Sequence, residues 1–221
     1  MKQNDQATFS EIFEINGILE KLPREFTKAK DALSNGEYYK YVKKLIDTTL
    51  SLEKITLRAR RLANISFKRK NMPLEYDKLV SKIADEAQKI SIEIDNNITK
   101  ITIPNTLPHY KDSFKSVLIE PLNYKLKGMA KSNLLPNYSQ VVFVIINEVS
   151  QNTNKKIIRD NDNYDYKQVI NTVAYWTLSD DGFNCCSMYN GTKIGEQDLT
   201  HIYIVPKSFF SDWYNQNLSD L

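Results

Sequence analysis

The stretch SQVVFVIINEVS, residues Ser139 to Ser150, is the strongest strand signal in the chain and decides the fold class. Its apolar run is rich in β-branched residues and lies between polar residues that favour turns. We therefore expect a sheet domain built around this strand.

Further strands and helices are predicted on both sides of it. Before it, residues 97–108 (NITKITIPNTLP) alternate as a strand does and reach Pro104, and residues 113–129 are helical with a possible interruption at Pro121. After it, residues 165–178 are helical, 183–190 and 200–206 are strands joined by 191–198, and 207–218 form a closing helix. This alternation of strands and helices predicts a small mixed α/β sheet domain over residues 98–221.

Residues 1–97 are predicted to form a separate helical bundle or hairpin. Thr8 and Glu11 fit a capping box, Pro23 breaks or kinks the first helix, and residues 34–36 (SNG) form a turn. A long helix then covers about residues 37–66, and another begins near Pro73. The predicted class is α+β, with helices first and the sheet domain after them.

Composition narrows the classes of protein. The chain is 41% hydrophobic and 26% charged, which argues against disordered and fibrous proteins, and its net charge of +3 permits nucleic-acid binding without proving it. The two cysteines, Cys185 and Cys186, are adjacent, so we expect both to remain thiols in a reducing compartment. With neither a signal peptide nor a transmembrane stretch visible, the prediction is a cytoplasmic protein.

The acidic segment RDNDNYDYKQVINTV, residues 159–173, is the main functional candidate. Asp160 and Asp162 are two residues apart, so in extended backbone both carboxylates can point the same way, and oxygen ligands of this kind select Mg²⁺, Mn²⁺ or Ca²⁺ over zinc. Asn163 adds a neutral ligand or an orienting hydrogen bond, and Lys167 is placed to meet a phosphate. The spacing does not fit a calcium EF-hand. The alternative is structural: Asp and Asn form turns, and Asp162 or Asn163 can cap the next helix.

The order of these residues resembles the RusA family of Holliday junction resolvases over about residues 98–210. The resemblance rests on DNDN (Asp160, Asp162, Asn163), then Lys167, then DD (Asp180, Asp181) before the next strand. Lys167 stands one residue later than the family lysine, and Asn171 replaces a usual Asp. The resemblance implies a homodimeric endonuclease of DNA recombination that nicks four-way junctions with Mg²⁺ held by Asp160, Asp162 and Asp180 or Asp181.

The geometry of the predicted helix 165–178 bears on this metal site. Such a helix is roughly 20 Å long, so the two acidic motifs lie at its opposite ends. They meet in one site only if the helix is shorter, if residues 179–183 double back, or if a second subunit supplies one motif. In a nuclease, the metal would activate water and stabilise the attacked phosphate, with Lys167 supporting that charge.

The helical half offers a candidate contact for DNA in residues 57–70 (LRARRLANISFKRK), where Arg58, Arg61, Lys68 and Arg69 are the proposed ligands. The alternative for this run is a solvated helix end. His109 and His201 have no partner at zinc-ligand spacing and are expected to be ordinary surface or strand histidines. Two hypotheses follow: a Mg²⁺-dependent endonuclease for branched DNA, or an inactive RusA-like binding or assembly protein that acts through its helices.

Overall fold

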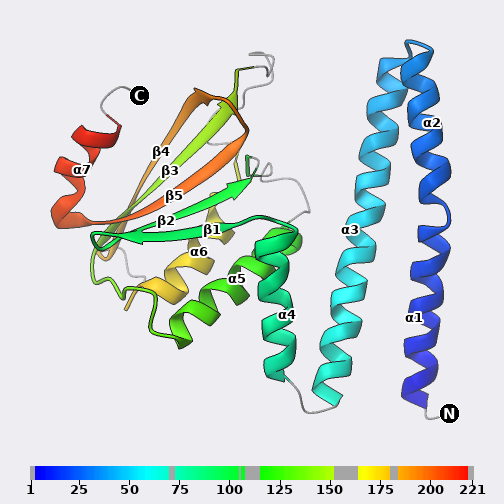
Figure 1. The fold of residues 1–221 in the computed structure, drawn as a ribbon, viewed down its shortest axis with the longest axis horizontal. Helices are drawn as coiled ribbons and strands as arrows, with labels where there is room; N and C mark the ends of the chain where they lie inside the picture. The colour runs from blue at the N-terminus through cyan, green and yellow to red at the C-terminus, as the bar shows by residue number, and fades with distance from the viewer. Residues whose placement is uncertain are drawn as a thin grey trace. The chain divides into compact units, whose positions relative to one another are not determined.

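The stretch that predicts the sheet forms its long strand β3 (Val141–Ser150). The computed structural model describes residues 3–69, 73–104, 106–107, 115–151, 164–179 and 184–218, and it divides the chain into two compact units, residues 1–76 and 77–221. We call these the helical unit and the sheet unit. Helices followed by a sheet domain confirm the predicted α+β class (Figure 1).

The sheet has five strands in the order β1-β2-β5-β3-β4. They are β1 (Ser91–Asp95), β2 (Ile98–Pro104), β3, β4 (Cys186–Gly195) and β5 (Leu199–Pro206). The pairs β1–β2, β2–β5 and β5–β3 are antiparallel, whereas β3 and β4 run parallel. The helix α6 (Tyr166–Thr177) connects that parallel pair, as such a crossover requires.

Strand β1 is absent from the predicted elements, and it moves the domain boundary. It forms a hairpin with β2 through Asn96 and Asn97, whose φ values of 48° and 60° suit a two-residue turn. The units divide after Tyr76, so the predicted boundary after residue 97 falls inside the sheet unit. The reason is packing, because Ala84 and Ile90 lie in the core of the sheet unit.

One face of the sheet is covered by helices and carries the main core. Leu122 and Leu126 of α5 (Lys115–Lys131) are fully buried there, with Val169 and Val173 of α6. The helix α5 continues through Pro121, so the predicted interruption does not occur. Proline removes one helical hydrogen bond, but burial of the two leucines just beyond it favours continuing the helix.

The opposite face, which we call the open face, has only a short covering helix among the described residues. After the turn η3 (Lys207–Phe209), α7 (Phe210–Asn217) packs Trp213 and Tyr214 over Val142, Val144 and Val205. These contacts cover the end of the sheet where β3 begins (Figure 1).

Strand β4 is placed differently from the prediction. It covers residues 186–195, whereas the sequence predicts a strand over 183–190 followed by a connection. The register runs from Val141↔Cys186 to Ser150↔Gly195, so β3 pairs with β4 along its whole length. Backbone pairing, which has no side-chain signature, makes residues 191–195 a strand.

The helical unit contains α1 (Gln3–Leu19), α2 (Leu22–Ser34) and α3 (Tyr38–Arg69), and α1 and α2 lie end to end along α3 (Figure 1). Pro23 lies in the first turn of α2, and Gly36 has a φ of 72° in the turn before α3, which confirms both predicted breaks. Because α1 begins at Gln3, Thr8 is not its cap, and the predicted capping box is wrong.

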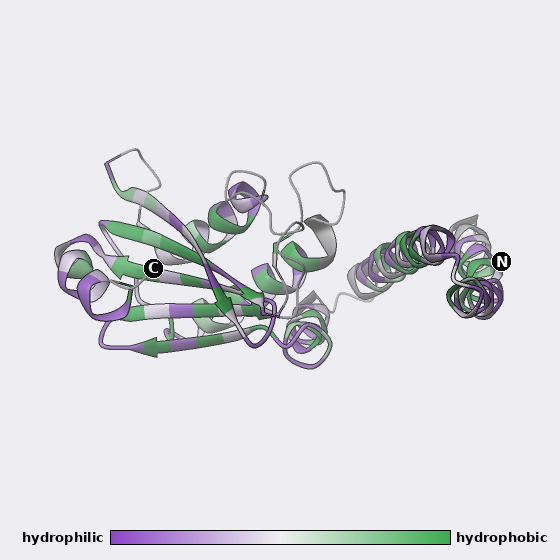
Figure 2. Ribbon diagram, turned by 90° about the horizontal axis from the view of Figure 1, so that it is seen from above, coloured by the Kyte–Doolittle hydropathy of each residue, from purple (hydrophilic) through white to green (hydrophobic). Residues whose placement is uncertain are grey.

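A further helix, α4 (Pro73–Glu86), begins at the predicted proline. Hydrophobic residues concentrate on the strands, whereas α1 to α3 mix hydrophobic and hydrophilic segments (Figure 2). Within the described ranges, no helix combines the length and the apolar character that crossing a bilayer demands.

Candidate functional site

The acidic residues of the predicted metal site lie outside the described part of the chain. Asp160, Asp162 and Asn163 fall in one such segment, and Asp180 and Asp181 in another. The metal site therefore stays a prediction. Among the residues that are described, no group of three His, Cys, Asp or Glu side chains is arranged to hold a metal ion.

The described residues next to these segments lie at opposite ends of α6. Tyr164 lies before its first turn and Ser179 after its last, and a helix of 12 residues rises about 18 Å. Strand geometry agrees, because the chain leaves β3 at Ser150 and enters β4 at Cys186, at opposite ends of the parallel pair.

Lys167 and Asn171 are both exposed on α6, where the sequence predicts them to share a face. The N-cap of α6 is Asp165, which makes no capping hydrogen bond with its side chain. The alternative prediction, that Asp162 or Asn163 caps this helix, is therefore wrong.

A buried polar network fixes the beginning of α6 on the sheet. Asn147 of β3 has no exposed surface, and its Nδ2 donates to the Tyr166 hydroxyl at 2.7 Å. The Thr200 hydroxyl of β5 donates to Asn147 Oδ1 at 3.3 Å. Burying an amide side chain is costly unless it is hydrogen-bonded, so these contacts define where α6 starts and hence where Lys167 projects. The sequence gives one signal, an Asn inside an apolar strand.

The predicted DNA ligands of α3 differ in their surroundings. Arg58 forms an ion pair with Glu14 of α1, which joins two helices of the helical unit. Arg61 is exposed, whereas the side chains of Lys68 and Arg69, at the end of α3, lie outside the described part. Arg60, between the two described arginines, is buried.

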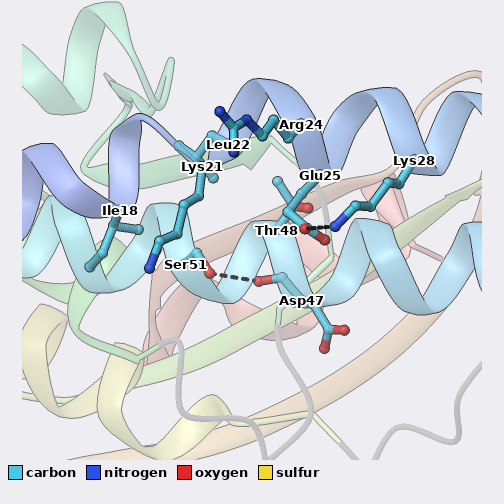
Figure 3. Close-up of a pocket in the computed structure, with 9 residues that line it drawn as sticks. All are labelled: Ile18, Lys21, Leu22, Arg24, Glu25, Lys28, Asp47, Thr48 and Ser51. Atoms are coloured by element: carbon cyan, nitrogen blue, oxygen red, sulfur yellow. Dashed lines mark hydrogen bonds and ion pairs between the residues drawn. The ribbon is translucent and has the colours of Figure 1, made fainter.

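A groove of about 500 Å³ lies between α3 and the junction of α1 with α2 (Figure 3). Ile18 and Leu22 line it together with Thr48. Glu25 also lines this groove, and its Oε1 accepts from Lys28 Nζ and its Oε2 from Lys44 Nζ, both at 2.7 Å. These hydrogen bonds lower the pKa of Glu25 to about 2.

A second groove, of about 480 Å³, continues along the same helices and is rich in lysine. Its lining includes Lys28, Lys40, Lys43 and Lys44. Acids interleave with them, and Lys40 Nζ meets Glu37 Oε1 at 2.8 Å. These grooves escape sequence reasoning because they depend on how α2 packs against α3.

The open face carries a connected set of polar side chains from four strands. The Glu148 carboxylate of β3 accepts from Lys193 Nζ of β4 at 2.8 Å and lies 3.4 Å from His201 Nε2 of β5. On the other side of the imidazole ring, Nδ1 lies 3.2 Å from the Thr102 hydroxyl of β2. We call Thr102, His201, Glu148 and Lys193 the open-face cluster.

Burial and charge act in different ways on this cluster. The hydrogen bond from Lys193 lowers the pKa of Glu148, and burial lowers the pKa of His201, which is only 7% exposed. A Cβ atom at Gly195 would lie 2.1 Å from Glu148 Oε1, so the glycine gives the carboxylate its space over β4. His201 is a strand histidine, as predicted, but its partners are not evident from the sequence.

No curated protein matches this sequence. Two crystal structures of the periplasmic domain of Helicobacter pylori MotB are similar in structure, each at 12% identity. The one that spans MotB residues 90–256 covers 62% of this chain and 94% of that domain with a TM-score of 0.35, and the one that spans residues 78–256 covers 58% and 92% with a TM-score of 0.34. Likeness at this level supports no inference about function. The chain belongs to DUF6100, a family of unknown function, whose model matches residues 4–221.

Proposed function

We propose that this chain is a binding or assembly protein that acts through its helical unit. The supporting observation is that α1 carries apolar side chains on more than one face. Ile18 lines the groove against α3, whereas Phe9 is 61% and Phe13 78% exposed. Phe9 and Phe13 lie one turn apart and share a face of α1, so this second apolar face is suited to a further partner.

The third helix adds exposed apolar side chains to the same unit. Tyr38, Tyr39 and Ile46 of α3 are all more than half exposed. By contrast, few apolar residues of the unit are buried among those whose side chains the structure describes: Leu22, Ala29, Ala32, Ile55 and Tyr76. Large apolar side chains that stay exposed beside a small core are candidates for protein–protein contact, and an amphipathic helix is the partner chemistry that we propose for them.

Site-specific photo-crosslinking in the full chain tests this proposal. A photoreactive phenylalanine analogue at Phe13 is expected to give one discrete product with a partner protein, and the same analogue at Ser132, an exposed polar residue of the sheet unit, is the control. Phe9→Ser combined with crosslinking at Phe13 should remove the product. Identical products from both positions, or no product from Phe13, would contradict the proposal.

A second candidate is a Mg²⁺- or Mn²⁺-dependent endonuclease, related to RusA-like resolvases, that nicks branched DNA as a homodimer. What favours it is that Lys167 is exposed in the first turn of α6, directly after the first acidic segment. The described residues next to the two acidic segments lie at opposite ends of α6. We therefore propose that, in the nuclease, two copies supply Asp160 and Asp162 on one side and Asp180 or Asp181 on the other.

In this nuclease the bound metal would supply an activated water and stabilise charge on the phosphate. Lys167 would add positive charge beside the phosphate, and Arg58, Arg61, Lys68 and Arg69 would grip the DNA backbone. Contacts of this kind weaken steeply with salt. Asn163 would orient the ligands through its amide.

Nicking of synthetic four-way junctions in Mg²⁺ separates the two candidates. A nuclease should nick the junction, and Asp162→Asn should abolish nicking while Asp95→Asn, a change at an exposed acid of β1, leaves it intact. Absence of nicking by the native, folded chain removes the second candidate. For either function we propose a cytoplasmic location, because Cys185 and Cys186 are not joined by a disulfide.

A further inference from the structure

Strand β4 is an edge of the sheet, and within the described residues it pairs with β3 alone. The N–H of Val141 donates to the carbonyl of Cys185, and the N–H of Gln151 donates to the carbonyl of Gly195. In a parallel pair, alternate residues direct both backbone groups toward the neighbour. The odd-numbered residues of β4 therefore bond to β3, and the even-numbered residues 186–194 direct N–H and C=O outward.

The two edges of the sheet differ in how they discourage pairing. Strand β1 has 5 residues and includes the exposed acids Glu93 and Asp95, which is a usual form of edge protection. Strand β4 has 10 residues and no proline. Lys193 is the one charged residue in its sequence, and Glu148 of the same chain neutralises it on the open face.

Exposed apolar side chains are placed symmetrically along this edge. Met188 and Ile194 are each 55% exposed, and each lies three residues from Gly191. Both are even-numbered and lie on the same face of the sheet. A second β4 strand running in the opposite direction would bring Met188 of one copy beside Ile194 of the other.

We propose that β4 pairs antiparallel with β4 of a second copy of this chain, with the two-fold axis at Gly191. In this register Met188 lies opposite the partner's Ile194, and Asn190 opposite the partner's Thr192. These even-numbered pairs are the ones whose backbone groups point outward, so each pair exchanges two hydrogen bonds.

The residue on the axis fits this arrangement. Gly191 is odd-numbered, so it forms a pair without hydrogen bonds, in which the two Cα atoms approach to about 4.5 Å. Its own Cβ position is already within 3.1 Å of Ile146 Cδ1, so a glycine suits both sides.

The association is tested by measuring the mass of the purified full chain over a range of concentrations. A dimer is expected. Met188→Pro removes an outward N–H without touching the β3 ladder, and Ile194→Lys places two charges on the interface, so each should give a monomer. Leu134→Lys, at a residue that is 61% exposed outside the sheet, is the control and should stay dimeric. Phe13→Ser should also stay dimeric, because α1 takes no part in this contact.

The register is tested by mixing two variants in a Cys185→Ser, Cys186→Ser background. Met188→Cys alone and Ile194→Cys alone should give no disulfide, whereas the mixture should give an intermolecular one. A monomeric native chain, a dimer that both β4 variants leave intact, or a dimer that fails to crosslink in the mixture would each overturn the proposal.

Discussion

For single residues of the open-face cluster, the sequence predicts the secondary structure but not the contacts. Alternation places His201 and Glu148 in strands and so predicts their kind of surroundings. Their contact at 3.4 Å depends on β5 lying between β2 and β3, which joins residues 53 positions apart. The role of Gly195 cannot be predicted from the sequence either, because this glycine leaves space for a carboxylate of another strand.

His201 should make stability depend on pH. Burial lowers its pKa in the folded chain, so the unfolded chain binds the proton more readily, and the stability present above the unfolded pKa of about 6.5 is lost as pH falls below it. Lys100 and Lys193 act in the same direction, and Glu148 opposes them. Between pH 7.5 and 5, the free energy of unfolding measured in urea should therefore change less with pH in His201→Gln than in the native chain.

The lowered pKa of Glu148 acts in a different window, because stability from an acid of this kind is lost only below its unfolded value of about 4.5. His109→Gln is the control for the effect above pH 5. If the pH dependence of the free energy of unfolding is unchanged in His201→Gln but lost in His109→Gln, the effect comes from His109 and the prediction is wrong.

Gly195→Ala should displace the Glu148 carboxylate from Lys193 and His201. Its Cβ would overlap Oε1, Cδ and Cγ of Glu148, so the Glu148 side chain has to rotate away as a whole, and we expect a loss of about 1–3 kcal/mol in the free energy of unfolding, the usual range for overpacking. In a Glu148→Ala background the same change should cost nothing, because the overlapping atoms are gone. Additive losses would show that the contact is unimportant.

Gly128→Ala is the matched control. Gly128 lies in α5 with no atom within 4 Å of its Cβ position, so alanine there should stabilise the chain by about 0.5–1 kcal/mol through helix propensity alone. Chemical denaturation of the four variants measures all of these effects.

At the scale of elements, periodicity predicts most of what the structure contains. The strands β2, β3 and β5 and the helix α6 have strong local signals and appear close to where the sequence predicts them. The two misses among the strands depend on backbone pairing. Strand β1 is one arm of a hairpin with β2, which follows it after a two-residue turn, and residues 191–195 are extended because they pair with the distant strand β3.

The anchoring of α6 gives a prediction for an element. Tyr166→Phe removes the acceptor of the Asn147 Nδ2 group, which is fully buried, so the free energy of unfolding should fall by about 1–3 kcal/mol. Urea denaturation followed by tryptophan fluorescence measures the loss, because Trp176 lies in α6 itself. Tyr175→Phe, at a side chain that is 75% exposed, is the control and should change little. Equal effects of the two changes would argue against the anchor.

At the scale of the whole molecule, the division into two units predicts separate unfolding. Both tryptophans, Trp176 and Trp213, belong to the sheet unit, whereas α1, α2 and α3 supply much of the helix. The helical unit buries few apolar side chains and should unfold first. On heating, the helical circular dichroism signal at 222 nm should therefore begin to weaken at least about 5 °C below the temperature at which tryptophan fluorescence begins to change.

Coincident thermal transitions would show that the units unfold together. The candidate metal site is also a question for the whole molecule. Its acids fall in two segments outside the described residues, and these segments would have to come together. Local spacing could suggest ligands there, but whether they converge depends on tertiary and quaternary contacts that no short motif records.

The position of β5 has a consequence for synthesis. Of the five described strands, β5 is synthesised after the other four, yet it occupies the centre of the sheet, between β2 and β3. Until residues 199–206 emerge, the pairs β1–β2 and β3–β4 cannot join, and the strand edges that β5 covers in the complete sheet stay unpaired. A transcript truncated before Leu199 should thus yield an aggregation-prone polypeptide instead of a smaller stable one.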